Sequence, residues 1–525
     1  MRDDERQYLD PMTARGPYRR RADTQQPNII VIGTDMVPVD FHTGPAAEAV
    51  MTPNIDELCR LRFGCAFATS PLCSPSRAAY MTGRHSYVTT NSERAHDGHA
   101  IHLRPDDTIF PEYLKASGYH VRHVGKCHAG AAKFIEVFGE NAAPWDRWSP
   151  PWRDDDAYAA YLKHRGLDRF DFDREILGRD LTGQGSGNSF GGWIAPQNGD
   201  PFPADATYPA YLAERAIDAI DARDTSRPLY LQLDFFGPHQ PFAIPGGMEE
   251  REAQIRSTMS LPASYAASFD PAEDGTEPRV YEIYRRNWGL QDEATVIDYR
   301  VANQLQFELI DEMIGRVLKH LQQLGLYEET WIFFMGDHGE MNGEAGLVDK
   351  GAYLHPRVVQ APLGLKPGLG AGPNVAGHVA QPVSLLDLAP TILDLAGISP
   401  EARLDGCSLL SSAAGETRPE DRPILFEVWS HVIPNPCVGT ILSGKGHPPH
   451  LFAFNACDSV DELYDLSTEG MPENLALLGD ERLDAAVRTL HARLVADERW
   501  KSYRGFLEIT YPHVLQAGGD RQLFV

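Results

Sequence analysis

Three short runs dominated by apolar residues stand out along the chain, over residues 28–33, 229–236 and 331–335. Runs of this length are typical of strands buried on both faces of a sheet. Two stretches with apolar positions three or four residues apart, 207–222 and 296–324, precede the second and third runs and predict helices. This alternation predicts an α/β fold with a large mixed, mostly parallel sheet flanked by helices.

The pattern divides the chain into three predicted parts. Residues 1–27 are polar and predict an N-terminal arm, residues 28–415 predict the main α/β domain, and residues 416–525 predict a small α+β C-terminal domain with a tail. The last part changes to short strands and one helix, which are predicted at 423–428, 438–443, 451–455 and 480–498. The aromatic tail after residue 500 suggests an oligomer contact.

Two insertions interrupt the main domain. Residues 140–200 are rich in Trp, Pro, Gly and Asp, and they predict an irregular insertion over the site, where a substrate is selected. Residues 245–295 predict a second, more helical and charged insertion. Residues 384–393 predict an apolar helix that returns to the core.

The three predicted strands all end in acidic or imidazole side chains. Asp35 follows the first strand, His239 the second, and Asp337 with His338 the third. Ligands bind beyond the carboxyl ends of the strands in parallel sheets, so these side chains predict a common site. The alternative is that Asp35 and Asp337 only cap helices, since Asp is a good N-cap residue.

Cys73 opens the segment Cys73-Ser74-Pro75-Ser76-Arg77. Proline suits the first position of a helix and serine suits the cap before it, so Cys73 is predicted at a helix N-terminus. The helix dipole and the free N–H groups there favour an anion, which predicts a reactive thiol with a lowered pKa.

The charge of the chain limits its partners. Asp and Glu number 74 against 48 Lys and Arg, which gives a net charge of −26. This excess predicts that neither nucleic acid nor an anionic membrane is a partner. An anionic substrate therefore needs a local cationic pocket.

Cysteine usage and the N-terminal residues bear on the compartment. The seven cysteines are sparse and lack Cys-x-x-Cys spacing, so a disulfide framework and a structural zinc site are not expected. The first 27 residues contain no apolar signal-peptide core, and no apolar stretch approaches the roughly 18 residues of a membrane span. These features predict a cytoplasmic protein.

Several motifs, in order along the chain, resemble those of the type I, formylglycine-dependent sulfatases of the alkaline phosphatase superfamily. They are Thr52–Leu58, Cys73–Gly83 with its Cys-x-Pro-x-Arg core, Gly125–His128, Gly237–Pro241, Gly336–Glu340, Lys350–Gly351, and Glu462–Leu466 with Glu473–Leu475. Choline sulfatases and phosphonate monoester hydrolases are the members that the chain resembles most.

The resemblance implies an alkaline phosphatase-like fold and hydrolysis of a small-molecule sulfate monoester. It implies that a formylglycine-generating enzyme converts Cys73 to formylglycine, whose hydrate attacks sulfur. One divalent metal ion would lower the pKa of the attacking hydroxyl. The metal ligands carried over from the family are Asp35, Cys73, Asp337 and His338.

The resemblance also assigns catalytic roles. Arg77 would hold the hydrate, and Lys126 with Lys350 would supply positive charge for the sulfate. His128 fits the base that releases sulfate from residue 73, and His239 fits the acid that protonates the leaving alkoxide. Glu340 and Tyr353 are expected to support or pack against the site, and Asn91 is a weaker candidate for a substrate contact.

One departure from the family concerns the metal. Many sulfatases carry two adjacent acids after the first strand, whereas this chain has Asp35-Met36, with Asp40 five residues after Asp35. Calcium prefers oxygen ligands and manganese accepts imidazole more readily, so both ions stay open.

Three alternatives also stay open. A phosphonate monoester or phosphodiester hydrolase would use the same nucleophile, although Lys126 and His128 favour a sulfatase. An unmodified Cys73 would leave an inactive oxyanion-binding protein. The substrate alcohol is also open, because the rings of the 140–200 insertion either stack on sugar, aryl or quaternary ammonium groups or form a local core. These rings are Trp145, Trp148, Trp152 and Trp193.

Overall fold

The computed structural model describes most of the chain. The described residues are 26–42, 45–86, 103–139, 144–147, 149–179, 186–269, 275–371, 377–410, 424–444, 447–467, 474–478 and 481–515. Nearly all of the predicted arm, Asn91, Trp148 and residues 516–525 lie outside these ranges. No helix within the described ranges is both long and apolar enough to span a membrane.

A seven-stranded sheet forms the centre of the molecule, with the strand order β11-β2-β10-β9-β1-β7-β4. Its strands are β1 (Ile29–Asp35), β2 (Leu61–Phe63), β4 (His120–Gly125), β7 (Leu229–Pro238), β9 (Trp331–Gly336), β10 (Leu363–Lys366) and β11 (Gly377–Val379). The neighbours β9, β1, β7 and β4 run parallel, whereas β10 is antiparallel to both β9 and β2. The three predicted strands are confirmed as β1, β7 and β9, and they are adjacent.

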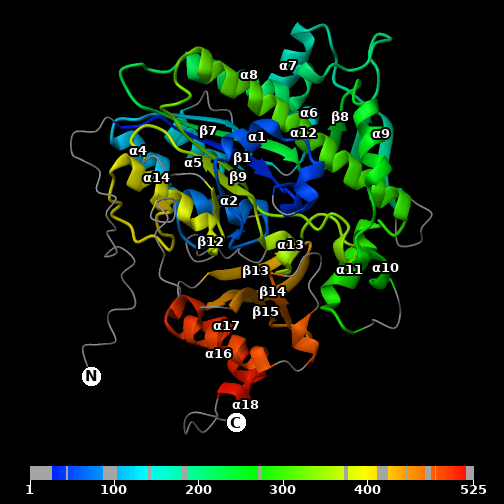
Figure 1. Ribbon diagram of the computed structural model, residues 1–525, viewed down its shortest axis with the longest axis vertical. Coiled ribbons are helices and arrows are strands. Elements are labelled where there is room, and N and C mark those ends of the chain that lie inside the picture. Colours follow the sequence, from blue (N-terminus) through cyan, green and yellow to red (C-terminus); the bar gives the residue numbers. More distant parts are fainter. Residues whose placement is uncertain are drawn as a thin grey trace.

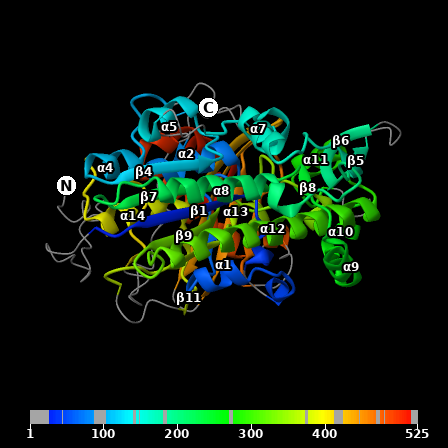
Figure 2. The ribbon, with the colours of Figure 1, turned by 90° about the horizontal axis from the view of Figure 1, so that it is seen from above.

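Helices cover both faces of this sheet (Figure 2). Ile30 and Ile32 of β1 pack with α8 (Tyr208–Asp221) and α12 (Glu293–Gln323) on one face. Ile29 and Val31 pack on the other face, where the helices are α2 (Cys73–Thr82), α4 (Phe110–Ala116), α5 (Ala131–Phe138) and α14 (Leu388–Ala396). Because alternate residues of a strand point to opposite faces and helices cover both, residues 29–32 of this central strand are all apolar. The predicted helices 207–222, 296–324 and 384–393 correspond to α8, α12 and α14 with the short 3-10 turn before it.

A four-stranded antiparallel sheet follows near the C-terminus, at one end of the molecule in Figure 1. It consists of β13 (Leu425–His431), β14 (Ile433–Gly444), β15 (His447–Asn455) and β16 (Glu462–Asp465), followed by α16 (Glu481–Val495) and α17 (Lys501–Thr510). Phe426 and Val428 of β13 share an apolar cluster with Phe67 and Leu72 of the main body. The predicted strands and helix are confirmed, and the sheet lies against the segment that leads into α2.

The prediction of an irregular insertion over 140–200 is wrong for its described parts. They form α6 (Pro151–Asp154), α7 (Asp156–His164), β5 (Phe172–Arg179) and β6 (Ser186–Ile194), and β6 pairs with β8 (Phe242–Ile244). Composition misled here because one acid of the Asp-rich stretch is a cap: the Asp155 carboxylate accepts from the backbone N–H groups of Ala157 and Tyr158. The second insertion is helical as predicted, with α9 (Glu249–Thr258), α10 (Ala263–Ala267) and α11 (Arg279–Trp288).

Shorter elements complete the described chain. They are α1 (Pro53–Leu58), β3 (Ala66–Phe67), α13 (Pro356–Val359), β12 (Val383–Ser384), α18 (Pro512–Leu515) and 3-10 turns at Val39–Phe41, Pro45–Ala49, Ala204–Ala206, Glu344–Gly346, Leu385–Asp387, Leu475–Leu478 and Glu498–Trp500.

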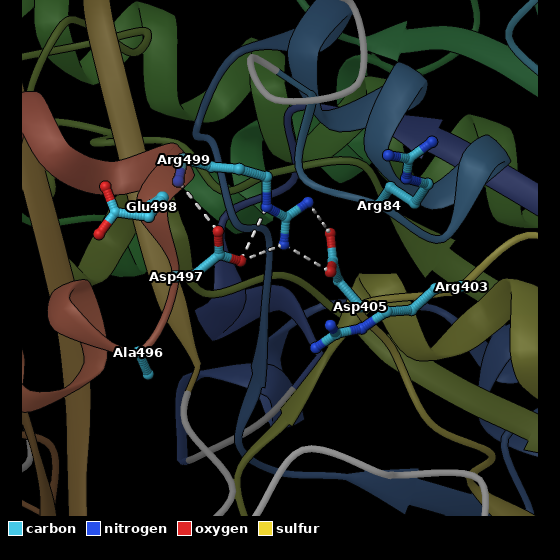
Figure 3. Close-up of a pocket in the computed structure, with 7 residues that line it drawn as sticks. All are labelled: Arg84, Arg403, Asp405, Ala496, Asp497, Glu498 and Arg499. Atoms are coloured by element: carbon cyan, nitrogen blue, oxygen red, sulfur yellow. Dashed lines mark hydrogen bonds and ion pairs between the residues drawn. The ribbon is translucent and has the colours of Figure 1, made fainter. Parts of the chain in front are cut away.

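A hollow of about 250 Å³ lies between the C-terminal helices and the chain that follows α2 (Figure 3). It is lined by Arg84, Arg403, Asp405, Ala496, Asp497, Glu498 and Arg499. Arg499 pairs with Asp405 at 2.9 Å and with Asp497 at 2.6 Å, which ties the C-terminal part to the main body. Because Arg84 follows the last turn of α2 and Cys73 begins it, the hollow is at the opposite end of that helix from Cys73.

Candidate active site

The polar groups that follow four parallel strands meet at one edge of the sheet. Strands β9, β1, β7 and β4 are consecutive neighbours, so their carboxyl ends lie side by side. The groups at this edge are Asp35, Lys126, His128, His239, Asp337 and His338. All of them are buried. The strand-end prediction is therefore correct about their placement, and β4 adds two members.

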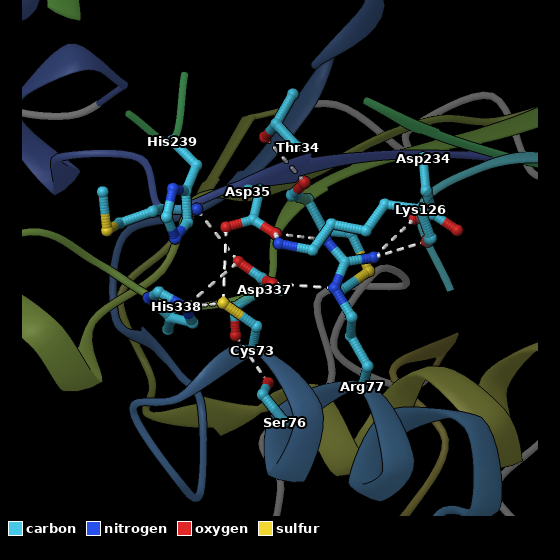
Figure 4. Close-up of polar contacts among 12 residues, drawn as sticks. Thr34, Asp35, Cys73, Ser76, Arg77, Lys126, Asp234, His239, Asp337 and His338 are labelled. Atoms are coloured by element: carbon cyan, nitrogen blue, oxygen red, sulfur yellow. Dashed lines mark hydrogen bonds and ion pairs between the residues drawn. The ribbon is translucent and has the colours of Figure 1, made fainter. Parts of the chain in front are cut away.

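Cys73 is the first residue of α2 and faces this edge (Figure 4). Its Sγ lies 3.2 Å from Nε2 of His338 and 3.5 Å from Oδ1 of Asp35. The N-cap is Leu72 rather than a serine, and Pro75 is the third helical residue, so the predicted cap is wrong. Any position in the first turn tolerates proline, because its N–H would have no partner within the helix.

The thiol of Cys73 is not activated. Burial raises its pKa to about 12, and the neighbouring Asp35 carboxylate adds to the increase. Lys126 and Lys350 act in the opposite direction but are outweighed. The prediction of a lowered pKa is wrong, because removing the thiolate from water costs more than the helix N-terminus supplies. All seven cysteines of the chain are free thiols.

Arg77 lies one turn after Cys73 and binds both acids of the site. Its Nε donates to Oδ2 of Asp337 at 2.9 Å, and its Nη2 donates to Oδ2 of Asp35 at 3.0 Å. Burial disfavours the charged form of this guanidinium and would lower its pKa. Tyr80 and the surrounding acids outweigh burial and raise the pKa of Arg77 well above its usual value. Since each carboxylate accepts from Arg77 through one oxygen, the other oxygen of each can bind a cation.

Four groups at this edge form a set that fits one cation. Asp35, Cys73, Asp337 and His338 each offer a ligand atom, and these atoms lie within 4.8 Å of one another. Nδ1 of His338 lies 2.8 Å from the carbonyl oxygen of Gly339 and donates to it, so Nε2 presents its lone pair to the cluster. Two carboxylates, an imidazole and the side chain of residue 73 suit a divalent ion.

The end of β1 and the segment after it contribute one carboxylate, that of Asp35, to this set. Met36 occupies the next position, and its backbone N–H donates to Oδ1 of Asp337 at 3.0 Å. Asp40 does not join the cluster, since its carboxylate is 43% exposed and pairs with Arg357. The cation set therefore contains two carboxylates rather than three.

Lys126 and His128 follow β4 on the other side of Asp35. Nζ of Lys126 lies 2.6 Å from Oδ2 of Asp35 and 4.7 Å from the centre of the Phe236 ring. Burial alone would raise the pKa of Asp35, but Lys126 and the other nearby cations hold it well below its usual value. Burial, aided by Lys126, lowers the pKa of His128 well below its usual value, so this imidazole is neutral.

A second lysine and histidine form a contact pair after β7 and β9. Nζ of Lys350 lies 2.7 Å from Nε2 of His239 and 3.0 Å from Oδ1 of Asp349. Burial, together with Lys350, lowers the pKa of His239 well below its usual value. Burial would raise the pKa of Asp349, but Lys350 and nearby imidazoles lower it to about 2.

Sequence reasoning missed Asp349 and two other buried polar residues, Asp234 and His123. An acid beside a lysine in a loop gives no local signal, because solvated charge pairs look the same. Asp234 did give a signal, since it interrupts an apolar strand. Glu340 behaves as expected of a supporting residue: it accepts from the Tyr299 hydroxyl at 3.2 Å and from the backbone N–H of Asp349.

The aromatic candidates are occupied within the protein. Trp152 packs edge-on against Phe236 with ring centres 5.7 Å apart, and the face of Trp193 carries the Arg174 guanidinium at 3.4 Å. Nε1 of Trp145 donates to the carbonyl of Ser149. Trp152 is part of the local core, and a cation of this chain already covers Trp193.

Comparison with known proteins gives one family and several relatives. The chain matches the family described as Sulfatase over residues 27–398. It is 26% identical over 524 residues to the choline-sulfatase of Rhizobium meliloti (strain 1021), and the match covers 93% of each chain. It is 25% identical over 398 residues to the arylsulfatase of Clostridium perfringens, which covers 73% of this chain and 78% of that one.

A solved structure confirms the expected alkaline phosphatase-like fold. The phosphonate monoester hydrolase from Silicibacter pomeroyi superposes with a TM-score of 0.67 at 21% identity, covering 90% of this chain and 95% of that chain. This likeness concerns the fold alone.

Proposed function

The chain belongs to the sulfatase family, and on that premise we propose that it is a sulfuric ester hydrolase that cleaves small sulfate monoesters at residue 73. The observation that carries the proposal is that Asp35, Asp337 and His338 converge on the side chain of Cys73. The buried ammonium groups of Lys126 and Lys350 also lie close enough to act on the pKa of its thiol. Burying this many charges at one strand edge costs free energy even where they are paired, and the packing of the sheet does not require them.

The residues present fit a formylglycine at position 73 and one divalent metal ion. A formylglycine hydrate at position 73 would supply a hydroxyl nucleophile, and one divalent ion, Ca²⁺ or Mn²⁺, would lower the pKa of that hydroxyl. Asp35, Asp337, His338 and residue 73 would hold the ion. A formylglycine-generating enzyme is the partner implied for maturation.

The lysines serve to bind the anion. The whole chain carries a net charge of −26, which repels a sulfate ester at long range. Lys126 and Lys350 counter this repulsion locally, since opposite unit charges 4 Å apart attract by about 4 kcal/mol at an effective dielectric of 20. Arg77 contributes indirectly, because it holds the carboxylates that orient the nucleophile.

The two histidines handle protons. His239 carries its proton on Nδ1, which contacts the carbonyl of Gln240, and its Nε2 shares the Lys350 proton. The Lys350–His239 pair therefore holds a transferable proton for the leaving alkoxide. His128 is neutral and can accept a proton from residue 73 when sulfate is released.

A phosphonate monoester or phosphodiester hydrolase is the second candidate. The single acid at Asp35-Met36 favours it, whereas Lys126 and His128 after β4 favour sulfate. A binding protein for oxyanions is the third, and it would require Cys73 to stay a thiol.

One experiment separates the three. The protein is co-expressed with a formylglycine-generating enzyme, loaded with Ca²⁺ or Mn²⁺, and assayed with a sulfate monoester, a phosphodiester and a phosphonate monoester. Mass spectrometry of the peptide containing residue 73 reports conversion, and Cys73→Ala is the control. We expect conversion and a preference for sulfate. A preference for a phosphorus ester would support the second candidate, and a converted, metal-loaded protein without activity would reject both enzymes. A Cys73 that stays a thiol despite co-expression, in a protein that hydrolyses none of the esters, would support the third.

A further inference from the structure

We propose that Asp234, held by His123, is a positioning residue that fixes the Arg77 guanidinium and, through it, the carboxylates of Asp35 and Asp337. The proposal rests on the proposed function, because it concerns the groups assigned above to the cation and the nucleophile. Asp234 itself touches neither residue 73 nor either of these carboxylates in the contacts of the described chain.

The first observation is a row of buried polar side chains on β7. Tyr230, Gln232 and Asp234 alternate along the strand and so share one face. The Tyr230 hydroxyl donates to Oε1 of Gln232 at 2.6 Å, and Nε2 of Gln232 donates to Oδ1 of Asp234 at 3.0 Å. All three are at most 2% exposed. A central parallel strand is normally apolar on both faces, so the row requires a reason beyond packing.

The second observation is where the row ends. Oδ1 of Asp234 lies 3.5 Å from Nη1 of Arg77, and the same Nη1 donates to the carbonyl of Lys126 at 3.0 Å. Arg77 is thus surrounded by three acids, two of which are proposed cation ligands while the third lies behind it (Figure 4). The carboxylate of Asp234 attracts Nη1, the guanidinium nitrogen that contacts neither Asp35 nor Asp337.

His123 fixes the other oxygen of Asp234. Nε2 of His123 lies 3.2 Å from Oδ2 and donates to it. The imidazole ring packs against Phe134 and Phe138, with ring centres 4.9 and 5.4 Å away. Since the aromatic rings hold the imidazole and the imidazole holds the carboxylate, Asp234 has little freedom to turn away from Arg77.

The third observation is that both neighbouring strands carry glycine in register with Asp234. These are Gly33 of β1 and Gly125 of β4. A Cβ at Gly33 would lie 2.1 Å from Oδ1 of Asp234, and a Cβ at Gly125 would lie 2.0 Å from its carbonyl oxygen. Glycine weakens a strand interior by roughly 0.5–1 kcal/mol. The sheet accepts this cost at Gly33, where only a hydrogen leaves room for the carboxylate.

These contacts predict what the loss of Asp234 does. Nη1 of Arg77 would keep only neutral acceptors, the Lys126 carbonyl and the Tyr80 hydroxyl. The guanidinium could then rotate, and the ligand oxygens of Asp35 and Asp337 would move with it. Changes of this kind behind a metal ligand typically weaken metal binding or activity by about 10–100-fold.

The test uses Asp234→Asn, which keeps the shape and removes the charge, and His123→Gln as a milder second variant. We expect kcat on the sulfate ester to fall by about 10–100-fold with KM within about 3-fold, and the affinity for Ca²⁺ or Mn²⁺, titrated alone by calorimetry, to fall similarly. Asp311→Asn is the matched control, because Asp311 is also buried but binds the backbone of Asn54 and Ile55 outside the site. It should keep both values.

A double-mutant cycle with Arg77→Lys separates positioning from general destabilisation. If Asp234 acts through Arg77, Asp234→Asn has little further effect on kcat or metal affinity in the Arg77→Lys background. An undiminished effect there, or wild-type kcat and metal affinity in a folded Asp234→Asn protein, would overturn the proposal. If the wild-type enzyme hydrolyses none of the esters, the proposed function fails, while the calorimetric arm still decides the role of Asp234. Should Asp234→Asn not fold, the same cycle with His123→Gln gives the decision.

Discussion

The ammonium of Lys350 donates to Nε2 of His239 across 2.7 Å, and both groups are buried. The same ammonium lies 3.0 Å from Oδ1 of Asp349, so Lys350 bridges a carboxylate and an imidazole. In the proposed mechanism, this relationship makes the pair, rather than His239 alone, the proton source for the leaving group.

The dependence of catalysis on the leaving group tests this pair. We expect His239→Gln to lower kcat by about 10²–10⁴-fold on an alkyl sulfate, whose alkoxide needs a proton to leave. On 4-nitrophenyl sulfate the loss should be much smaller, because the phenolate leaves without protonation. Rates measured across a series of alcohols check this. Equal losses on both esters would show that His239 does not protonate the leaving group.

The lysine after β4 should contribute to sulfate binding in the transition state. Lys126→Gln is expected to lower kcat/KM for the sulfate ester by about 10²–10³-fold, the usual effect of removing one oxyanion donor. Lys133→Gln is the matched control: Lys133 of α5 is also buried, but it pairs with Glu112 of α4 at 2.9 Å. A similar loss in both variants would point to stability rather than anion binding.

Metal addition should stabilise the protein through the four-ligand set. After treatment with EDTA, an ion at 100 times its Kd stabilises the folded state by about 2.7 kcal/mol, which raises Tm. Asp337→Asn should abolish most of this increase, because it removes a carboxylate ligand and keeps the shape. Asp40→Asn should not, since Asp40 pairs with Arg357 outside the cluster. A full increase in Asp337→Asn would place the ion elsewhere.

Unconverted Cys73 should be inert to alkylation. Burial raises the pKa of this thiol to about 12, so almost no thiolate exists at pH 8. Iodoacetamide should therefore label exposed Cys457 in the folded protein, and label Cys73 only after unfolding in urea. Peptide mass spectrometry reads both sites. Rapid labelling of Cys73 in the folded state would contradict the burial argument.

The buried imidazole of His355 should make stability depend on pH. Burial lowers its pKa to about 3, whereas the unfolded chain has the ordinary value near 6.5. Below about pH 6.5 the unfolded state binds a proton that the folded state refuses, so stability falls by about 1.4 kcal/mol per pH unit down to about pH 3.

The variant His355→Asn should remove this contribution and keep an acceptor for the backbone N–H of Arg357. Urea unfolding of both proteins at pH 7 and pH 5 measures the difference. The exposed His164 provides the control, since His164→Asn should leave the dependence of the free energy of unfolding on pH unchanged. An unchanged slope in His355→Asn would show that the imidazole is protonated in the folded state.

The sequence was most informative where a rule is local. The strands β1, β7 and β9 were predictable because a strand between two layers of helices must be apolar on both faces. Asp35, His239 and Asp337 were predictable as a group because parallel strands bring their carboxyl ends together.

The rest depended on contacts between distant segments. The pKa of Cys73 follows from burial by the completed fold, and the helix start alone pointed in the wrong direction. The contact between His123 and Asp234 spans 111 residues, and pairing across a sheet has no signature in either strand. In the 140–200 insertion, the capping role of Asp155 emerged only from its two backbone donors.

The burial of the first turn of α2 also fixes the timing of any chemistry on the chain itself. Residues 72–77 are all buried, and the C-terminal sheet lies against the segment before them, where the backbone N–H of Glu427 donates to the carbonyl of Thr69 at 2.9 Å. A small ester needs to reach only one side chain, but a modifying enzyme must grasp the peptide around Cys73. Such an enzyme can act only on a nascent or unfolded chain. Residue 73 would therefore be modified before the chain folds or not at all, and a molecule that folds with an unmodified Cys73 keeps that thiol until it unfolds.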